Sequence, residues 1–260
     1  EWILFTDADT WMSPELIADS VRAAVAQQAD LLCLLPLQKR INVWGRAAVL
    51  NFSMGLVIAA ARANRDRPYS PVGIGAFNLV RAEAYRRSGG YEALRMEVID
   101  DMKLGLLIQR NGGRLRCYTA ADQAEMDWAA SAFDLVRALE KNFFALTDLR
   151  FGISAFAIAT MLAAWFTAVA GAFSGMWTGY AAFASLLLMV VPTLSFSRHS
   201  SWGIRSALLA PWIYPVLPWT LLRSTWMTWR QGGIRWRGTL YPLDRLRKHR
   251  VSLFERTGRT

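Results

Sequence analysis

The sequence predicts an α/β domain followed by transmembrane α-helices. Within the first 150 residues, short apolar runs typical of buried strands alternate with helical patterns, and charged residues are scattered throughout. Residues 151–197 contain no Asp, Glu, Lys or Arg, and about 20 apolar residues suffice to cross a bilayer. Eight of the twelve Trp residues lie at or after Trp165, and Trp is enriched at membrane–water interfaces.

The chain opens with a predicted strand, helix and strand. Residues 2–6 are apolar and β-prone, and they lead into Asp7-Ala8-Asp9. Ser13-Pro14-Glu15 then predicts a helix to about residue 28, with Ser as the N-cap and Pro in the first turn. Residues 31–35 form a second apolar run. Continuous apolar strands in this order favour a parallel sheet.

The rest of the α/β domain follows the same reasoning. Residues 44–61 predict a helix that lies either at a membrane surface or in the core, and both interpretations stay open. Glycines at 89–90 and 112–113 predict the ends of two helices. The further expected strands are 77–80 and 115–119, and the further expected helices are 82–87, one from Asp100 to Asn111, and 131–146.

The apolar half predicts a hairpin of two membrane spans within residues 151–197, with a turn near Ser174-Gly175. Residues 206–222 are a charge-free run of 17 residues with three prolines, so we expect a re-entrant or interfacial segment. We divide the chain into a catalytic domain (1–150), a transmembrane region (151–222) and a basic tail (223–260).

The net charge of +10 is concentrated at the C-terminus, where residues 223–260 hold ten Lys or Arg against two acids. Beside apolar spans, such a tail indicates a cytoplasmic flank near anionic lipid and no nucleic-acid partner. We therefore expect a multi-pass protein of the cell (inner) membrane with its catalytic domain in the cytoplasm. Cys33 and Cys117 have no metal-site or disulfide spacing, and Cys33 is expected in the core.

Two carboxylate motifs are candidates for chemistry. Asp7 and Asp9 follow a strand, where α/β sheets bind ligands, and two such carboxylates can share a hard divalent cation. The alternative is a polar turn before the next helix. Asp100 and Asp101 begin a helix, so they either cap it or supply a general base whose proton affinity is raised by its neighbour.

Gly73-Ile74-Gly75-Ala76 precedes the strand predicted at 77–80. Its glycines would let the backbone approach a substrate closely, although an ordinary loop is the alternative. The spacing does not match a dinucleotide-binding fingerprint, because no third glycine follows.

Taken in order, these motifs resemble the inverting family 2 glycosyltransferases. The features that carry the resemblance are Asp7-x-Asp9, Gly73-x-Gly75-Ala76-Phe77, Arg81-x-x-x-Tyr85, Gly89-Gly90-Tyr91 and Ile99-Asp100-Asp101-x-x-Leu104-Gly105. Within that family the chain looks most like the membrane-anchored branch with the ceramide glucosyltransferase-like, hopanoid-associated and carotenoid glycosyltransferases. The match covers about residues 1–150.

The resemblance implies a partial GT-A nucleotide-sugar-binding domain and metal-dependent sugar transfer, with inversion, to a lipid-like acceptor. Asp7 and Asp9 would hold Mg²⁺ or Mn²⁺ against the donor diphosphate. Asp101 would be the general base, with Asp100 in place of the family's Glu, and the loop Gly73, Ile74, Gly75 and Ala76 would bind substrate. We expect the two acid sites about 10 Å apart, because each acts on a different end of the reacting sugar.

The sequence departs from the family in two places. Processive members carry Gln-x-x-Arg-Trp, for which residues 139–143 match only in position and residues 231–236 have one residue too many. Lys141 would supply the positive charge at the diphosphate, or it is a solvated helix lysine. The chain does not begin with Met and opens inside a strand-like run, so we expect that a nucleotide-binding part precedes Glu1.

Two other functions are compatible with parts of the sequence. A processive polysaccharide synthase would need more spans and the intact Gln-x-x-Arg-Trp motif. A non-catalytic membrane scaffold would have no need of Asp7, Asp9 and Asp101 together. Both alternatives are distinguished from a lipid glycosyltransferase by the product formed from nucleotide sugars.

Overall fold

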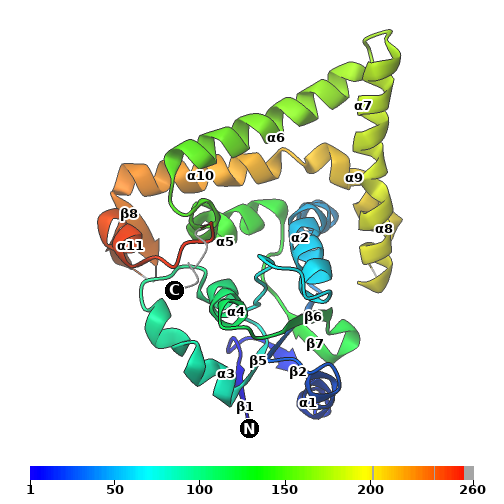
Figure 1. Ribbon diagram of the computed structural model, residues 1–260. Helices are drawn as coiled ribbons and strands as arrows, with labels where there is room; N and C mark the ends of the chain where they lie inside the picture. The colour runs from blue at the N-terminus through cyan, green and yellow to red at the C-terminus, as the bar shows by residue number, and fades with distance from the viewer. Residues whose placement is uncertain (201, 237, 255–260) are drawn as a thin grey trace. The chain divides into compact units, whose positions relative to one another are not determined.

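The computed structural model describes residues 1–200, 202–236 and 238–254 (Figure 1). It contains two compact units. The first comprises Glu1–Lys39, Gly55–Asp127 and the segment from Lys248 on, and the second comprises Arg40–Met54 and Trp128–Arg247. Residues 255–260 of the predicted basic tail, and Arg237, lie outside the described residues.

A four-stranded mixed sheet forms the centre of the first unit (Figure 1). Its order is β1 (Trp2–Phe5), β5 (Asn78–Arg81), β3 (Leu31–Leu35) and β6 (Leu115–Thr119). β5 runs antiparallel to both of its neighbours, β1 and β3, and β3 pairs in parallel with β6. β1, β3 and β6 therefore run in one direction, and the prediction of a parallel sheet is wrong for β5. Apolar strands indicate burial on both faces, and burial does not specify strand direction.

Helices cover both faces of this sheet, which explains why β3 lacks alternating polar residues. Leu32 packs in one apolar cluster with residues of α1 (Leu16–Ala26). Leu31 and Cys33 point to the other face, where they pack with residues of α4 (Asp100–Arg110). The predicted burial of Cys33 is confirmed.

The N-cap predicted for the first helix is wrong. α1 begins at Leu16, and no side chain caps it. The backbone N–H of Ser13 instead donates to the Gln123 carbonyl at 2.8 Å, because a short strand precedes it. That strand belongs to a second small sheet of order β2 (Trp11–Met12), β7 (Ala124–Met126) and β4 (Leu37–Gln38), which the sequence did not predict.

The glycine stops in the first unit are confirmed. α3 (Ala82–Arg87) is followed by Gly89, whose φ of 81° places it in the left-handed region. α4 ends at Arg110, and Gly112 two residues later also has a φ of 81°. Two short 3₁₀ helices, η1 (Gly90–Leu94) and η2 (Ala121–Gln123), complete this unit.

Among its described residues, the second unit contains helices and one strand hairpin. α5 (Ala132–Phe143) is capped by Ser131, whose side chain accepts a hydrogen bond from the Asp134 N–H. The hairpin of β8 (Gly233–Trp236) and β9 (Thr239–Pro242) was not predicted. The remaining elements are η3 (Ala145–Thr147), α6 (Phe151–Gly171), α7 (Trp177–Leu188), α8 (Val190–His199), α9 (Ile204–Ile213), α10 (Val216–Gln231) and α11 (Leu243–His249).

The predicted helical hairpin after residue 150 is present in α6 and the helices that follow it. α6 and α7 approach closely, since a Cβ on Gly171 would lie 2.3 Å from the Gly179 carbonyl oxygen. Gly175 lies in the turn between them with a φ of 68°. Phe151–Gly171 and Trp177–Ser197 are both long and apolar enough to cross a membrane.

α2 (Val43–Ala63) is the third helix with the length and composition of a membrane span, and it passes from the second unit into the first. Its N-terminal half lies in the core of the second unit, where Ala48 and Leu50 are fully buried. Ile58, further along, is exposed. The core interpretation therefore holds for its N-terminal half, and the membrane-surface interpretation stays a prediction for the exposed part.

The proline-rich run at residues 206–222 is divided between two helices. α9 ends at Ile213, and α10 begins at Val216 after Pro215. This interruption follows from proline chemistry, because proline lacks a backbone N–H donor. Neither α9 nor α10 reaches the length of a membrane span.

Candidate active site

The first acidic motif follows the carboxyl end of β1. Thr6 Oγ1 donates to the Ala76 carbonyl at 2.9 Å, which ties the end of β1 to the loop before β5. A turn then forms, in which the Thr10 N–H donates to the Asp7 carbonyl at 3.3 Å. Asp7 and Asp9 are both exposed within this turn. Their carboxylates are accessible to a ligand at this edge of the sheet.

The glycine loop reaches the same edge because β5 is antiparallel to β1. Phe5 pairs with Asn78, so the residues just before β5 lie beside those just after β1. Asn78 is fully buried, and its Oδ1 accepts a hydrogen bond from the Ile74 N–H at 3.1 Å. The loop is therefore held by a buried amide of the sheet itself.

Gly73 brings the loop against the N-terminus of α4. A Cβ on Gly73 would lie 1.9 Å from the Asp101 carbonyl oxygen, so no larger residue fits without backbone movement. One turn along α4, a Cβ on Gly105 would lie 2.0 Å from the Val72 carbonyl oxygen. These two glycines determine how closely the loop and the helix approach each other.

Asp101 makes two hydrogen bonds and does not cap α4, which has no side-chain cap. One carboxylate oxygen accepts from the N–H of the adjacent residue Met102 at 2.7 Å. The other oxygen accepts from the Gly75 N–H at 2.9 Å, on a separate segment of the chain. Asp100, its neighbour, is exposed. The second hydrogen bond orients the Asp101 carboxylate toward the glycine loop.

Asp7 and Asp101 converge on Gly75. A Cβ on Gly75 would lie 3.1 Å from an oxygen of the Asp7 carboxylate and 3.7 Å from an oxygen of the Asp101 carboxylate. Both distances are measured from the same Cβ position on Gly75. The two carboxylates therefore lie closer together than the separation of about 10 Å that we expected. Glycine at this position leaves the space between them open.

The surroundings of Asp101 favour its protonated form. Burial, together with the negative charges of Asp100 and Asp7, raises the pKa of Asp101 to about 6, and hydrogen bonds from Met102 and Gly75 oppose this shift. Burial, and then the negative charges of Asp100 and Asp101, raise the pKa of the Tyr91 hydroxyl well above its ordinary value. Tyr91 therefore adjoins the carboxylates, although the sequence motif Gly89-Gly90-Tyr91 carried no assigned role.

The residues present fit a divalent cation only together with a ligand. Among the described residues, no group of three or more His, Cys, Asp or Glu side chains is arranged to hold a metal ion. Mg²⁺ is commonly bound through one or two carboxylates plus substrate phosphates. Asp7 and Asp9 match that pattern in kind, so a metal would be held when a diphosphate completes its shell.

Lys141 belongs to the second unit, so no geometry relates it to these carboxylates. It is half-buried, and its ammonium lies 5.0 Å from the centre of the Trp236 ring. It therefore differs from a fully solvated helix lysine. Both partial matches to Gln-x-x-Arg-Trp contribute to the lining of one pocket. Lys141 comes from the match at residues 139–143, and Gln231, Arg235 and Trp236 come from the match at residues 231–236.

No protein-family model matches the chain, and a comparison with curated proteins finds no match.

Proposed function

We propose that the chain is the catalytic and membrane part of an inverting glycosyltransferase that moves a sugar from a nucleotide carrier to a lipid-like acceptor. One observation carries this proposal. The Asp101 carboxylate is held by the Gly75 N–H, shares an open space with Asp7, and has a pKa raised to about 6. A carboxylate with a pKa near the working pH is well suited to general-base catalysis.

The proposed reaction is a single displacement. Asp101 takes the proton of the acceptor hydroxyl, whose oxygen forms a bond to the anomeric carbon as the bond to the nucleoside diphosphate breaks. Asp7 and Asp9 are the residues that would hold Mg²⁺ or Mn²⁺, and the ion would supply positive charge to stabilise the leaving diphosphate. The N–H of Gly75 keeps the Asp101 carboxylate turned toward the space between the two acids.

The packing of the second unit supports a lipid-like acceptor. On α10 the large residues Trp226 and Trp229 are exposed, while the small hydroxyl residues Ser224 and Thr228 are buried. Ser224 accepts a hydrogen bond from the Phe144 N–H at 2.9 Å, so the buried hydroxyl has a partner. A helix in water shows the reverse distribution, so this face of α10 suits lipid contact.

The membrane placement is part of the same proposal. Phe151–Gly171 and Trp177–Ser197 would cross the cell (inner) membrane, and the basic residues after Arg223 would remain on the cytoplasmic side with the catalytic domain.

The test is a product assay with the full-length protein. Membranes that contain it are incubated with a panel of nucleotide sugars, and lipids are identified by mass spectrometry. We expect one sugar added to a lipid, and Asp101→Asn should slow this transfer by roughly 10² to 10⁴. Asp122→Asn, at an exposed acid in the same unit, should not. A polymeric product, or no transfer from any donor, would contradict the proposal.

A further inference from the structure

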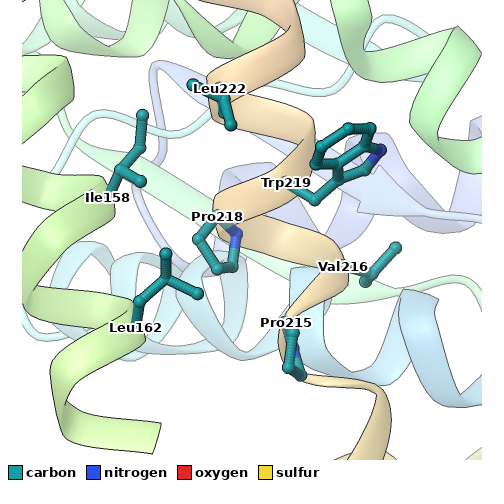
Figure 2. A pocket seen from close by; sticks show the side chains of 7 residues that line it. All are labelled: Ile158, Leu162, Pro215, Val216, Pro218, Trp219 and Leu222. Carbon is teal, nitrogen blue, oxygen red and sulfur yellow. The ribbon is translucent and has the colours of Figure 1, made fainter. Parts of the chain in front are cut away.

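A buried ion pair in the first unit has no role in the reaction proposed above. Lys103 Nζ lies 3.5 Å from Glu97 Oε2, and the two side chains are only 2% and 6% exposed. Burial removes the hydration of both charges, so such a pair is stable only when hydrogen bonds satisfy its other polar atoms. By contrast, the groove between α6 and α10 is lined by uncharged side chains, which have no such requirement (Figure 2).

The ion pair binds the backbone of one residue in the segment that follows α11. Lys103 donates a hydrogen bond to the Val251 carbonyl, and the Val251 N–H donates to Glu97. The Val251 side chain packs against the apolar cluster to which α4 contributes. We call residues 251–254 the strap. Both backbone groups of its first residue are therefore bound by buried charges of the first unit.

α4 carries the base and the strap contacts on different faces. With 3.6 residues per turn, the side chains of Asp101 and Lys103 project about 200° apart. Gly105, one turn after Asp101, adjoins the glycine loop. Arg110, about two turns after Lys103, donates to the Ser252 carbonyl at 2.6 Å. The glycine loop and the strap therefore hold α4 from different sides.

The two charged residues also flank the base along the chain. Glu97 lies in the connection between η1 and α4, four residues before Asp101, and Lys103 lies two residues after it. Movement of this stretch would change how the Asp101 carboxylate meets the Gly75 N–H. A general base must lie within hydrogen-bond reach of the proton that it takes. A displacement of about 1 Å is enough to slow an enzymatic reaction roughly 10²-fold.

We propose that Glu97 and Lys103 are positioning residues that bind the strap and thereby hold the Asp101 carboxylate in place for proton transfer. This inference rests on the proposed glycosyl transfer, to which it adds a requirement for residues 251–254. Loss of the strap contacts should lower kcat and leave donor binding intact, because Asp7 and Asp9 lie in the turn after β1 and not on α4.

The test uses the full-length protein in membranes, with the nucleotide sugar that gives a product. Val251→Pro removes the N–H that donates to Glu97 and leaves the ion pair itself in place. We expect kcat to fall roughly 10- to 100-fold, while KM for the nucleotide sugar stays within about twofold of the parent value. Glu92→Gln, which breaks an exposed ion pair with Arg95, is the control and should leave both constants unchanged.

A double variant separates strap binding from the cost of an unpaired buried charge. Glu97→Gln combined with Lys103→Met removes both charges, and neutral replacement of a buried ion pair is often tolerated. It also removes the donor to the Val251 carbonyl. We expect the same fall in kcat at an unfolding temperature close to that of the parent. A fall in activity that only follows the loss of folded protein in both variants would overturn the positioning role.

Hydrogen–deuterium exchange tests the strap without relying on sugar transfer. The Gly75 N–H, which donates to Asp101, should lose protection in Val251→Pro, while β3 in the same unit keeps its protection. Unchanged exchange in the glycine loop would overturn the inference, as would an unchanged kcat in Val251→Pro. A parent protein that is inactive with every donor would instead contradict the proposed function, and the exchange measurement would still decide whether the strap holds Asp101.

Discussion

Replacing Asp101 by Asn should slow sugar transfer by roughly 10² to 10⁴ and should make the protein more stable at neutral pH. The physical reason is that burial and two neighbouring acids disfavour the charged carboxylate in the folded state. An uncharged amide of the same shape does not carry this cost. Asp101 would therefore be an example of a residue whose catalytic use opposes stability.

The magnitude follows from the shift in pKa from 3.8 to about 6. At 1.36 kcal/mol per pKa unit, the charged form costs about 3 kcal/mol in the folded state. Because the pKa of Asp101 is raised in the folded state, the protonated carboxyl stabilises the parent protein. This stabilisation is fully present below pH 3.8 and is lost as the pH rises through about 6. Asn has one acceptor oxygen, so either the Gly75 or the Met102 N–H loses its partner, which costs about 1 kcal/mol.

The assay is chemical denaturation of the full-length protein in detergent at several pH values. Relative to the parent, Asp101→Asn should gain about 2 kcal/mol in the free energy of unfolding between pH 4.5 and pH 8. At pH 8 it should be the more stable protein by about 2 kcal/mol. Asp122→Asn, which alters an exposed acid, provides the control. A difference between parent and Asp101→Asn that does not change with pH would refute the raised pKa, and with it the electrostatic argument for the base.

Three more predictions follow from the same site. The rate constant kcat/KM should fall as the pH drops below about 6, where Asp101 becomes protonated, and a pH–rate profile with no such limb would contradict its role. Gly73→Ala should cost about 1 to 3 kcal/mol of stability, because the new Cβ meets the Asp101 backbone at 1.9 Å; Gly152→Ala, with nothing within 4 Å of its Cβ, is the matched thermal-unfolding control. Asp9→Asn should abolish turnover without unfolding the protein, since the change is isosteric in an exposed turn, and full activity of that variant in excess EDTA would exclude the metal.

Local patterns in the sequence predicted where several elements begin and end. The helix over residues 82–87, the stop after Arg110 and the hairpin that begins at Phe151 each follow from glycine chemistry or from the apolar run. These signals involve neighbouring residues only, so they can be interpreted without knowledge of the fold. That Asp7, Asp101 and the Gly73 loop form one site was implied by the resemblance to the family 2 glycosyltransferases and not by a local pattern.

Tertiary structure alone decided how those residues meet. The glycine loop reaches Asp7 because β5 runs antiparallel between β1 and β3, and apolar strand patterns carry no information on direction. Asp101 reaches Gly75 because Gly73 and Gly105 permit a backbone contact that spacing does not reveal. Its raised pKa depends on burial and on the charge of Asp7, which is 94 positions away in the printed sequence. Pairing, close approach and desolvation are properties of three-dimensional packing, so only the folded chain decides them.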